Sequence, residues 1–200
     1  MKISVSKTKS MTISKDSLRC KLAIDGTIIE QVMSFNYLGV EVTSDRDSNR
    51  EVRAQASKGA AISGYLRDVI WSNRYMLLDN KIRIYKTCVR PILTYAAESR
   101  SDTSKTKQLL RTTEMKTLRQ ICGYTLRDKK RSTDIREECN IQDIVRWTRD
   151  RRRYWRDHVN RMGDNRLAKI TMTSKPSGKR PVGRPPKRWR ECWTSTSQEQ

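Results

Sequence analysis

The sequence is poor in the residues that build most catalytic and metal centres. Its 200 residues include a single histidine, His158, which excludes His-His metal sites and leaves a catalytic triad improbable. It also has no P-loop and no GxGxxG motif, so the common nucleotide-binding loops are absent. The five cysteines show no CxxC or CxxxC spacing, which removes the usual zinc motifs and predicts reduced cysteines that mostly serve packing.

Long apolar runs are missing as well. The mean hydropathy is −0.83, and neither a transmembrane helix nor a signal peptide is predicted, so we expect a soluble, intracellular chain. Leu, Ile, Val and Phe together number 38 of 200 residues, which is near the range of disordered proteins. Five Trp, seven Tyr and several periodic windows offset this shortage. We therefore expect a thinly cored folded part that carries at least one disordered tail.

Acidic residues are few relative to basic ones. Lys and Arg number 43 and Asp and Glu 22, so the formal charge is +21 and the pI is about 10.2. A charge excess of this size predicts a polyanionic partner, because each Lys or Arg placed on a phosphate releases condensed counterions. A membrane surface would also require an amphipathic or lipidated anchor, and none is found. Nucleic acid is the predicted partner, and a membrane is not.

The hydrophobic pattern predicts an α+β fold that is mainly helical. Asp25-Gly26 is a tight hairpin signal within a small antiparallel β region. We expect its strands at 3–5, 11–13, 18–24, 27–32 and 35–42. Helices are expected at 47–70, 77–94, 104–122, 133–138 and 142–162, with Pro91 kinking or breaking the second and Gly123 ending the third.

The last predicted helix is rich in arginine. Six Arg fall within eleven residues of residues 146–156, opposed in that stretch only by Asp150. Like charges on adjoining turns repel one another, and bound phosphates would relieve that repulsion, so we favour phosphate contact over a merely solvated face. Trp147, Tyr154 and Trp155 are expected on the apolar side of the helix. The predicted nucleic-acid contacts here are Arg146, Arg149, Arg152, Arg153 and Arg156.

Residues 175–190 hold four of the five prolines, seven basic residues and no acid, which predicts a disordered basic arm. Its Gly183-Arg184-Pro185 tripeptide resembles the core of an AT-hook, in which an extended chain lies in a narrow minor groove. Val182 replaces the usual Arg, so weaker binding is expected, and a nuclear-localisation or general basic tail is the alternative. The predicted contacts are Lys179, Arg180, Arg184, Lys187 and Arg188.

Seven sequence blocks, in order, resemble the C-terminal part of reverse transcriptases of non-LTR retrotransposons, the LINE-type elements of the RTE-like and jockey-like groups. They are SKTKSM (6–11), SFNYLGVEVTSD (34–45), RPILTYAAE (90–98), EMKTLRQICG (114–123), IREECNIQDI (135–144), RRRYWRDHVNRM (151–162) and GKRPVGRPPKRW (178–189). The resemblance implies the end of a palm at 1–44, a helical thumb at 45–125, a linker with the Arg-rich helix at 126–172, and a basic tail at 173–200. The thumb-like bundle thus separates the β region from the disordered basic arm.

The resemblance also implies roles for residues of the β region. Lys7 and Lys9 would lie near the incoming nucleotide, and Tyr37 and Gly39 would belong to a primer-grip turn. The alternatives are a solvated basic strand edge and a set of core aromatics under a turn. Such polymerases hold two Mg²⁺ ions on an Asp-Asp pair, and this sequence has no Asp-Asp dipeptide. No catalytic residue, no metal site and no cofactor are therefore expected in this chain, which should not polymerise alone.

These observations lead to one hypothesis and two alternatives. The chain is expected to grip an RNA-DNA hybrid or duplex DNA, and element RNA, together with the palm and fingers of a full-length polymerase, in the nucleus with a cytoplasmic phase. The first alternative is a stand-alone, non-enzymatic DNA-binding protein that uses the AT-hook-like arm. The second is a decayed copy with no function.

Overall fold

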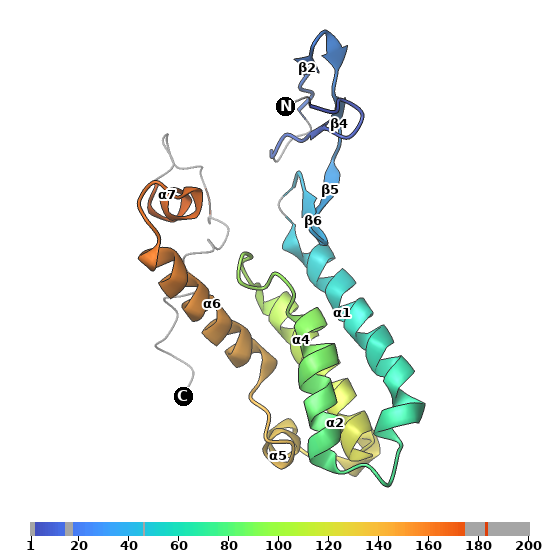
Figure 1. Ribbon diagram of the computed structural model, residues 1–200. Helices are drawn as coiled ribbons and strands as arrows, with labels where there is room; N and C mark the ends of the chain where they lie inside the picture. Colours follow the sequence, from blue (N-terminus) through green and yellow to red (C-terminus); the bar gives the residue numbers. More distant parts are fainter. Residues whose placement is uncertain (1–2, 15–17, 46, 175–182, 184–200) are drawn as a thin grey trace. The chain divides into compact units, whose positions relative to one another are not determined.

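The computed structural model describes residues 3–14, 18–45, 47–174 and 183 (Figure 1). The described part is mainly helical, with small β pairs at its N-terminal end, which confirms the predicted α+β fold class. The chain divides into two compact units, residues 1–52 and residues 53–200. Each unit is described below by itself.

The described residues of the first unit form six short strands: β1 (Lys9–Ser10), β2 (Ala23–Ile24), β3 (Thr27–Ile28), β4 (Glu30–Gln31), β5 (Ser34–Tyr37) and β6 (Val40–Thr43). β2 and β3 form the predicted antiparallel hairpin, and Asp25 and Gly26 take φ values of 50° and 77° at its turn. β5 and β6 form a second antiparallel hairpin, whereas β1 and β4 pair in parallel. The run predicted at 35–42 is thus two strands joined by a tight turn.

The second unit begins within α1 (Ser48–Leu66), which continues into the π-helical turn η1 (Arg67–Trp71). Next come α2 (Leu78–Ile84), a second π-helical turn η2 (Tyr85–Val89) and α3 (Arg90–Leu93). Pro91 lies at the start of α3, where its missing N–H matters least. The expected break at this proline is therefore a change of helical winding just before it, because a π turn absorbs the distortion without ending the helix.

The longest helices after this are α4 (Ser104–Cys122) and α6 (Ile144–Arg161). The bounds of α4 match the predicted ones, because Thr103 and Thr106 form a reciprocal capping box and Gly123 ends the helix at φ 76°. η3 (Leu126–Asp128) and α5 (Ser132–Glu138) connect α4 to α6. α7 (Leu167–Thr173), which the sequence pattern did not predict, follows α6.

The core of the second unit is centred on α4, which contacts η1, α2, α5 and α6 (Figure 1). Its largest fully buried side chains are Tyr85, Leu93, Leu110, Leu118, Ile135 and Ile144. The backbone of α1 approaches α3 closely, since a Cβ placed on Gly59 would lie 2.3 Å from a Leu93 methyl group. None of the helices in the described part of the chain is long and apolar enough to cross a membrane.

Candidate nucleic-acid interface

α6 is the arginine-rich helix that the sequence predicted as a phosphate-binding element. Asp143 caps its N-terminus, accepting hydrogen bonds from the backbone N–H groups of Val145 (2.9 Å) and Arg146 (3.2 Å). Five residues of the helix are buried: Ile144, Val145, Thr148, Arg152 and Val159. One side of α6 is therefore fixed against the core, and its remaining arginines are distributed around the other sides.

Arg152 is a correction to the predicted set of phosphate contacts. The residue is only 3% exposed, its Nε donates to the carbonyl oxygen of Ala97 (2.7 Å), and its Nη1 lies 2.7 Å from an Asp102 carboxylate oxygen. Asp102 is itself 2% exposed. The guanidinium therefore forms a buried ion pair that holds α6 to the segment before α4. It is not available to a phosphate.

Three other arginines of α6 also lie beside carboxylates. Arg151 pairs with Glu98 (3.1 Å), Arg153 with Asp150 (3.6 Å) and Arg156 with Asp157 (3.0 Å). These pairs are partly exposed, so solvent and salt weaken them. The helix is thus more nearly charge-balanced than its sequence indicated, although Arg153 and Arg156 can still turn toward a phosphate.

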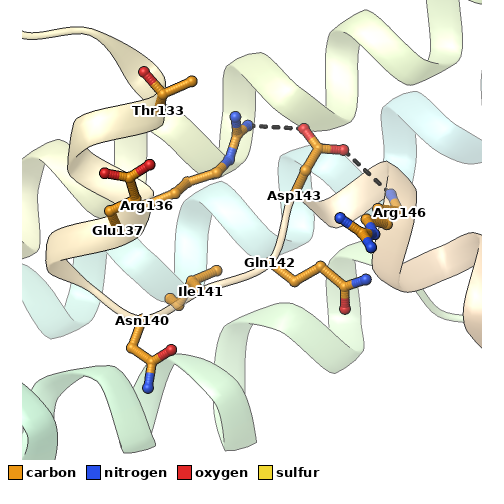
Figure 2. A pocket seen from close by; sticks show the side chains of 8 residues that line it. All are labelled: Thr133, Arg136, Glu137, Asn140, Ile141, Gln142, Asp143 and Arg146. Carbon is orange, nitrogen blue, oxygen red and sulfur yellow. Dashed lines mark hydrogen bonds and ion pairs between the residues drawn. The ribbon is translucent and has the colours of Figure 1, made fainter. Parts of the chain in front are cut away.

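Arg146 and Arg149 complete the predicted set on this helix. Arg146 is exposed and lines a surface cavity of about 550 Å³ at the junction of α5 and α6, and Arg149 is half-buried. Figure 2 shows Arg136 of α5 reaching Asp143 across this cavity, with Arg146 on its α6 side. Arg146 is therefore the most accessible of the five predicted contacts on α6.

The aromatic residues of α6 divide differently from the prediction. Trp147 is half-buried, and its ring faces the guanidinium groups of Arg90 (4.8 Å to the ring centroid) and Arg151 (5.7 Å). Tyr154 is 72% exposed and Trp155 36% exposed. Neither lies in the core, although both were expected on the apolar side of the helix. Tyr154 offers an exposed ring next to the arginines.

A buried carboxylate joins the helices that carry these residues. Glu114 of α4 is fully buried and accepts hydrogen bonds from Arg136 (3.0 and 3.2 Å), Tyr85 (3.2 Å) and the Ile144 backbone N–H (3.3 Å). Burial raises the pKa of Glu114 in spite of the Arg136 charge, and burial also raises the pKa of Tyr85 well above 10.0. This network fixes η2, α5 and the start of α6 against α4.

Asp143 extends the network to the surface. Its carboxylate lies 3.0 Å from Arg136 and accepts a hydrogen bond from Arg111 (2.9 Å). Burial acts to raise the pKa of Asp143, but the Arg111 hydrogen bond and the charges of Arg136 and Arg111 outweigh it, so the pKa is lowered from 3.8. Two of the similar blocks, 114–123 with Glu114 and 135–144 with Arg136 and Asp143, therefore meet in one structural network that the sequence pattern did not reveal.

The segment between α4 and α5 carries a second group of basic residues, which the sequence interpretation missed. We call residues 127–131 (Arg-Asp-Lys-Lys-Arg) the basic loop. All five of its residues are exposed. Lys130 pairs with Glu138 (3.3 Å) and lies over the Tyr124 ring (3.8 Å), and Asp128 accepts from the Thr125 N–H and hydroxyl. Arg127, Lys129 and Arg131 lie at the surface. The three consecutive basic residues at 129–131 were the sequence signal from which this basic surface could have been predicted.

In the first unit, the predicted contacts lie on strands and turns. Lys7 is exposed in a turn, where its backbone N–H donates a hydrogen bond to the Ser4 carbonyl oxygen (3.2 Å). Lys9 of β1 forms an ion pair with Glu30 of β4. Tyr37 is 62% exposed at the end of β5, and Gly39 takes a φ of 80° in the following turn. Phe35 and Leu38 are exposed as well, so the alternative of core aromatics under this turn is not what the structure shows.

The remaining predicted contacts, Lys179, Arg180, Arg184, Lys187 and Arg188, lie outside the described residues, as does the predicted basic arm. Among residues 3–14, 18–45 and 47–174, no three His, Cys, Asp or Glu side chains are grouped as a metal ion would require. The two-metal site of a polymerase requires such a group of carboxylates, which the described residues do not form.

The chain is similar to one curated protein, which is described as an uncharacterized transposon-derived protein of Caenorhabditis elegans. The two are 28% identical over 172 residues, which is 82% of this chain and 60% of the nematode protein. This chain thus spans about 60% of the length of the relative that it matches. No family model and no solved structure matches. The similarity supports a transposon origin. The finer resemblance to LINE-type reverse transcriptases stays a prediction.

Proposed function

We propose that the chain binds nucleic acid through phosphate contacts as the C-terminal, thumb-like part of a non-LTR retrotransposon reverse transcriptase. The observation that carries the proposal is the set of basic side chains left at the surface of the helical unit. Positive charge is presented at the surface, outside the packed and hydrogen-bonded core, by Arg146, Arg153 and Arg156 of α6 and by the basic loop. The transposon-derived relative and the formal charge of +21 support the same interpretation.

The partner proposed is an RNA-DNA hybrid or duplex DNA, with element RNA as a further partner. Phosphate contacts position a nucleic acid without reading its sequence, so we expect weak sequence preference. Lys7, Lys9, Tyr37 and Gly39 would contact a primer terminus if the missing palm and fingers are supplied by a longer protein. The proposed location is the nucleus. Polymerisation and Mg²⁺ binding are assigned to such a full-length protein and not to this chain.

The proposal is tested by binding of the full chain to a labelled hybrid and to duplex DNA over a series of salt concentrations. A protein that neutralises several phosphates should give a log-log slope of roughly −5 or steeper, at about −0.9 per phosphate on duplex DNA. Fluorescence anisotropy with a 20-base-pair hybrid, a matched duplex and a random single strand measures this directly. A flat salt response would remove phosphate contact as the basis of binding.

Deletion of residues 175–200 separates this proposal from the stand-alone, arm-based alternative. If the helical unit holds the hybrid, the shortened chain should keep most of its affinity and its preference for hybrid over duplex. If the AT-hook-like arm carries binding, the deletion should remove nearly all affinity, above all for A-T-rich duplex. Circular dichroism of the shortened chain controls for loss of folding.

A further inference from the structure

Two cysteines that are distant in the sequence face each other in the helical unit. Cys122 is the last residue of α4, and Cys139 directly follows α5. Their sulfur atoms lie 3.2 Å apart, and both are free thiols. Since a disulfide bond measures about 2.0 Å, the sulfurs need to approach by only about 1 Å to bond. The helix ends that carry them are positioned by the Glu114–Arg136 network, so this proximity is built into the fold.

The two thiols have different environments. Cys122 is partly exposed, whereas Cys139 is buried at 3% exposure. The contact between the two thiols lowers the pKa of Cys122, and the same contact, with burial, raises the pKa of Cys139. Cys122 is therefore the thiol that ionises first and the one that a reagent can reach, which are the two properties of an attacking cysteine.

We propose that Cys122 and Cys139 are a reversible dithiol–disulfide pair that exchanges with low-molecular-weight disulfides such as glutathione disulfide. The Cys122 thiolate attacks one sulfur of glutathione disulfide, and one glutathione thiolate leaves and takes up a proton. Cys139 then loses its proton and attacks the Cys122 sulfur, forming the intramolecular bond and releasing the second glutathione, which takes up that proton. Two electrons pass from the protein dithiol to glutathione disulfide, and two glutathione thiols result.

The bond would cross-link the C-terminal ends of α4 and α5 and close a loop that contains the basic loop. Closing a loop of this length restricts the unfolded chain, so the oxidised protein should melt at a temperature roughly 5 to 10 °C higher than the reduced protein. In an intracellular setting such a bond would form transiently, as in redox-responsive proteins. The proposal does not depend on nucleic-acid binding.

The test is mass spectrometry of the full chain after incubation with glutathione disulfide. A trypsin digest under non-reducing conditions should contain the peptide 120–127 linked to the peptide 137–146, and dithiothreitol should separate them. The melting temperature measured on the same samples should rise on oxidation and fall back on reduction. If both peptides remain reduced, or carry glutathione without a link between them, the proposal is wrong. This measurement needs no variant.

Two variants test the assigned order of attack. In Cys139→Ser, Cys122 has no resolving partner, so it should accumulate as the mixed disulfide with glutathione. In Cys122→Ser, the buried Cys139 should stay reduced. Cys88→Ser, which removes an exposed thiol elsewhere, is the matched control and should leave the 122–139 link unchanged. Equal modification of Cys139 in Cys122→Ser and of Cys122 in Cys139→Ser would overturn the assignment of Cys122 as the attacking thiol.

Discussion

The basic loop and α6 have similar densities of positive charge in the sequence but use them differently in the fold. Residues 127–131 contain four basic residues, and residues 149–156 contain five arginines. In α6, four guanidinium groups lie beside carboxylates, and one of them is buried. In the basic loop, Lys130 has a carboxylate partner and its other basic residues are at the surface. The number of arginines in a sequence run therefore gives its charge, but not how many of them are available to bind phosphate.

Asp150 and Asp157 lie within α6, but the other two acidic partners of its arginines come from a distant part of the sequence. Glu98 and Asp102, which pair with α6, lie some fifty residues earlier in the chain, on the segment before α4. A window of sequence around the arginines cannot include them. The basic loop, by contrast, connects two helices at the surface, where its charges face solvent rather than a packed neighbour.

The largest effect is expected for Arg152→Gln. The change removes one member of a buried ion pair and leaves the Asp102 carboxylate with only the more distant Arg100 (3.9 Å), which should lower the free energy of unfolding by about 2 to 4 kcal/mol. Urea denaturation followed by circular dichroism measures the loss. The double variant Arg152→Met with Asp102→Leu removes both charges of the pair but also takes Asp102 away from Arg100, so it should recover only part of the loss. A loss below about 1 kcal/mol for the single change would show that this arginine is not structural.

The next effect concerns binding. Replacing Arg127, Lys129 and Arg131 with Gln should reduce the magnitude of the salt slope by about 2 to 3 and the affinity for a hybrid at 0.15 M salt by roughly 100-fold. The matched variant replaces Arg151, Arg153 and Arg156 of α6 with Gln, which removes the same formal charge. Because these three arginines already lie beside carboxylates, the matched variant should weaken binding less. Equal losses would contradict the difference drawn between the two regions.

A smaller and pH-dependent effect is expected for Asp143→Asn. Asparagine still caps α6 but cannot pair with Arg111 and Arg136, so we expect a loss of about 1 to 2 kcal/mol at pH 7. The folded state lowers the pKa of Asp143, so the stabilisation is complete above the ordinary value of 3.8 and is lost as pH falls through the folded pKa. The difference between the wild type and the variant should therefore shrink below pH 4. A difference that grows toward acid pH would reverse the assigned sign.

Local signals predicted the fold best where particular residues mark the end of a helix or strand. α4 was predicted with its observed bounds because its apolar residues recur on one face and a glycine follows it. The Asp25-Gly26 hairpin was likewise predicted from the residues of its turn. The turn at Leu38-Gly39 was expected only from the resemblance, since a leucine at a φ of 49° gives no local turn signal and the strand pattern ran through it. The seven-residue helix α7 was missed because a helix that short shows too little periodicity.

The candidate site was less predictable, since it depends on contacts between elements. The spacing places Glu114 on the same face of α4 as Leu110 and Leu118, but only its partners Arg136 and Tyr85 explain how a carboxylate is buried there. Likewise, the spacing of Cys122 and Cys139 matches no motif, because two helix ends bring them together. The Asp25-Gly26 turn depends on one local pair of residues. The burial of Glu114 depends on contacts among four separate elements.

The smallest effect should come from Arg153→Gln, which differs from Arg152→Gln by one position on the same helix. Arg153 lies at the surface, and its contact with Asp150 (3.6 Å, one turn away) is an exposed ion pair of a kind that contributes about 0.5 kcal/mol or less. Its free energy of unfolding should therefore stay within about 0.5 kcal/mol of the wild type in the same urea experiment. A loss comparable with that of Arg152→Gln would mean that α6 does not separate a structural arginine from those that face a partner. A near-zero loss, with a reduction of about 1 in the salt slope, would place Arg153 among the phosphate contacts.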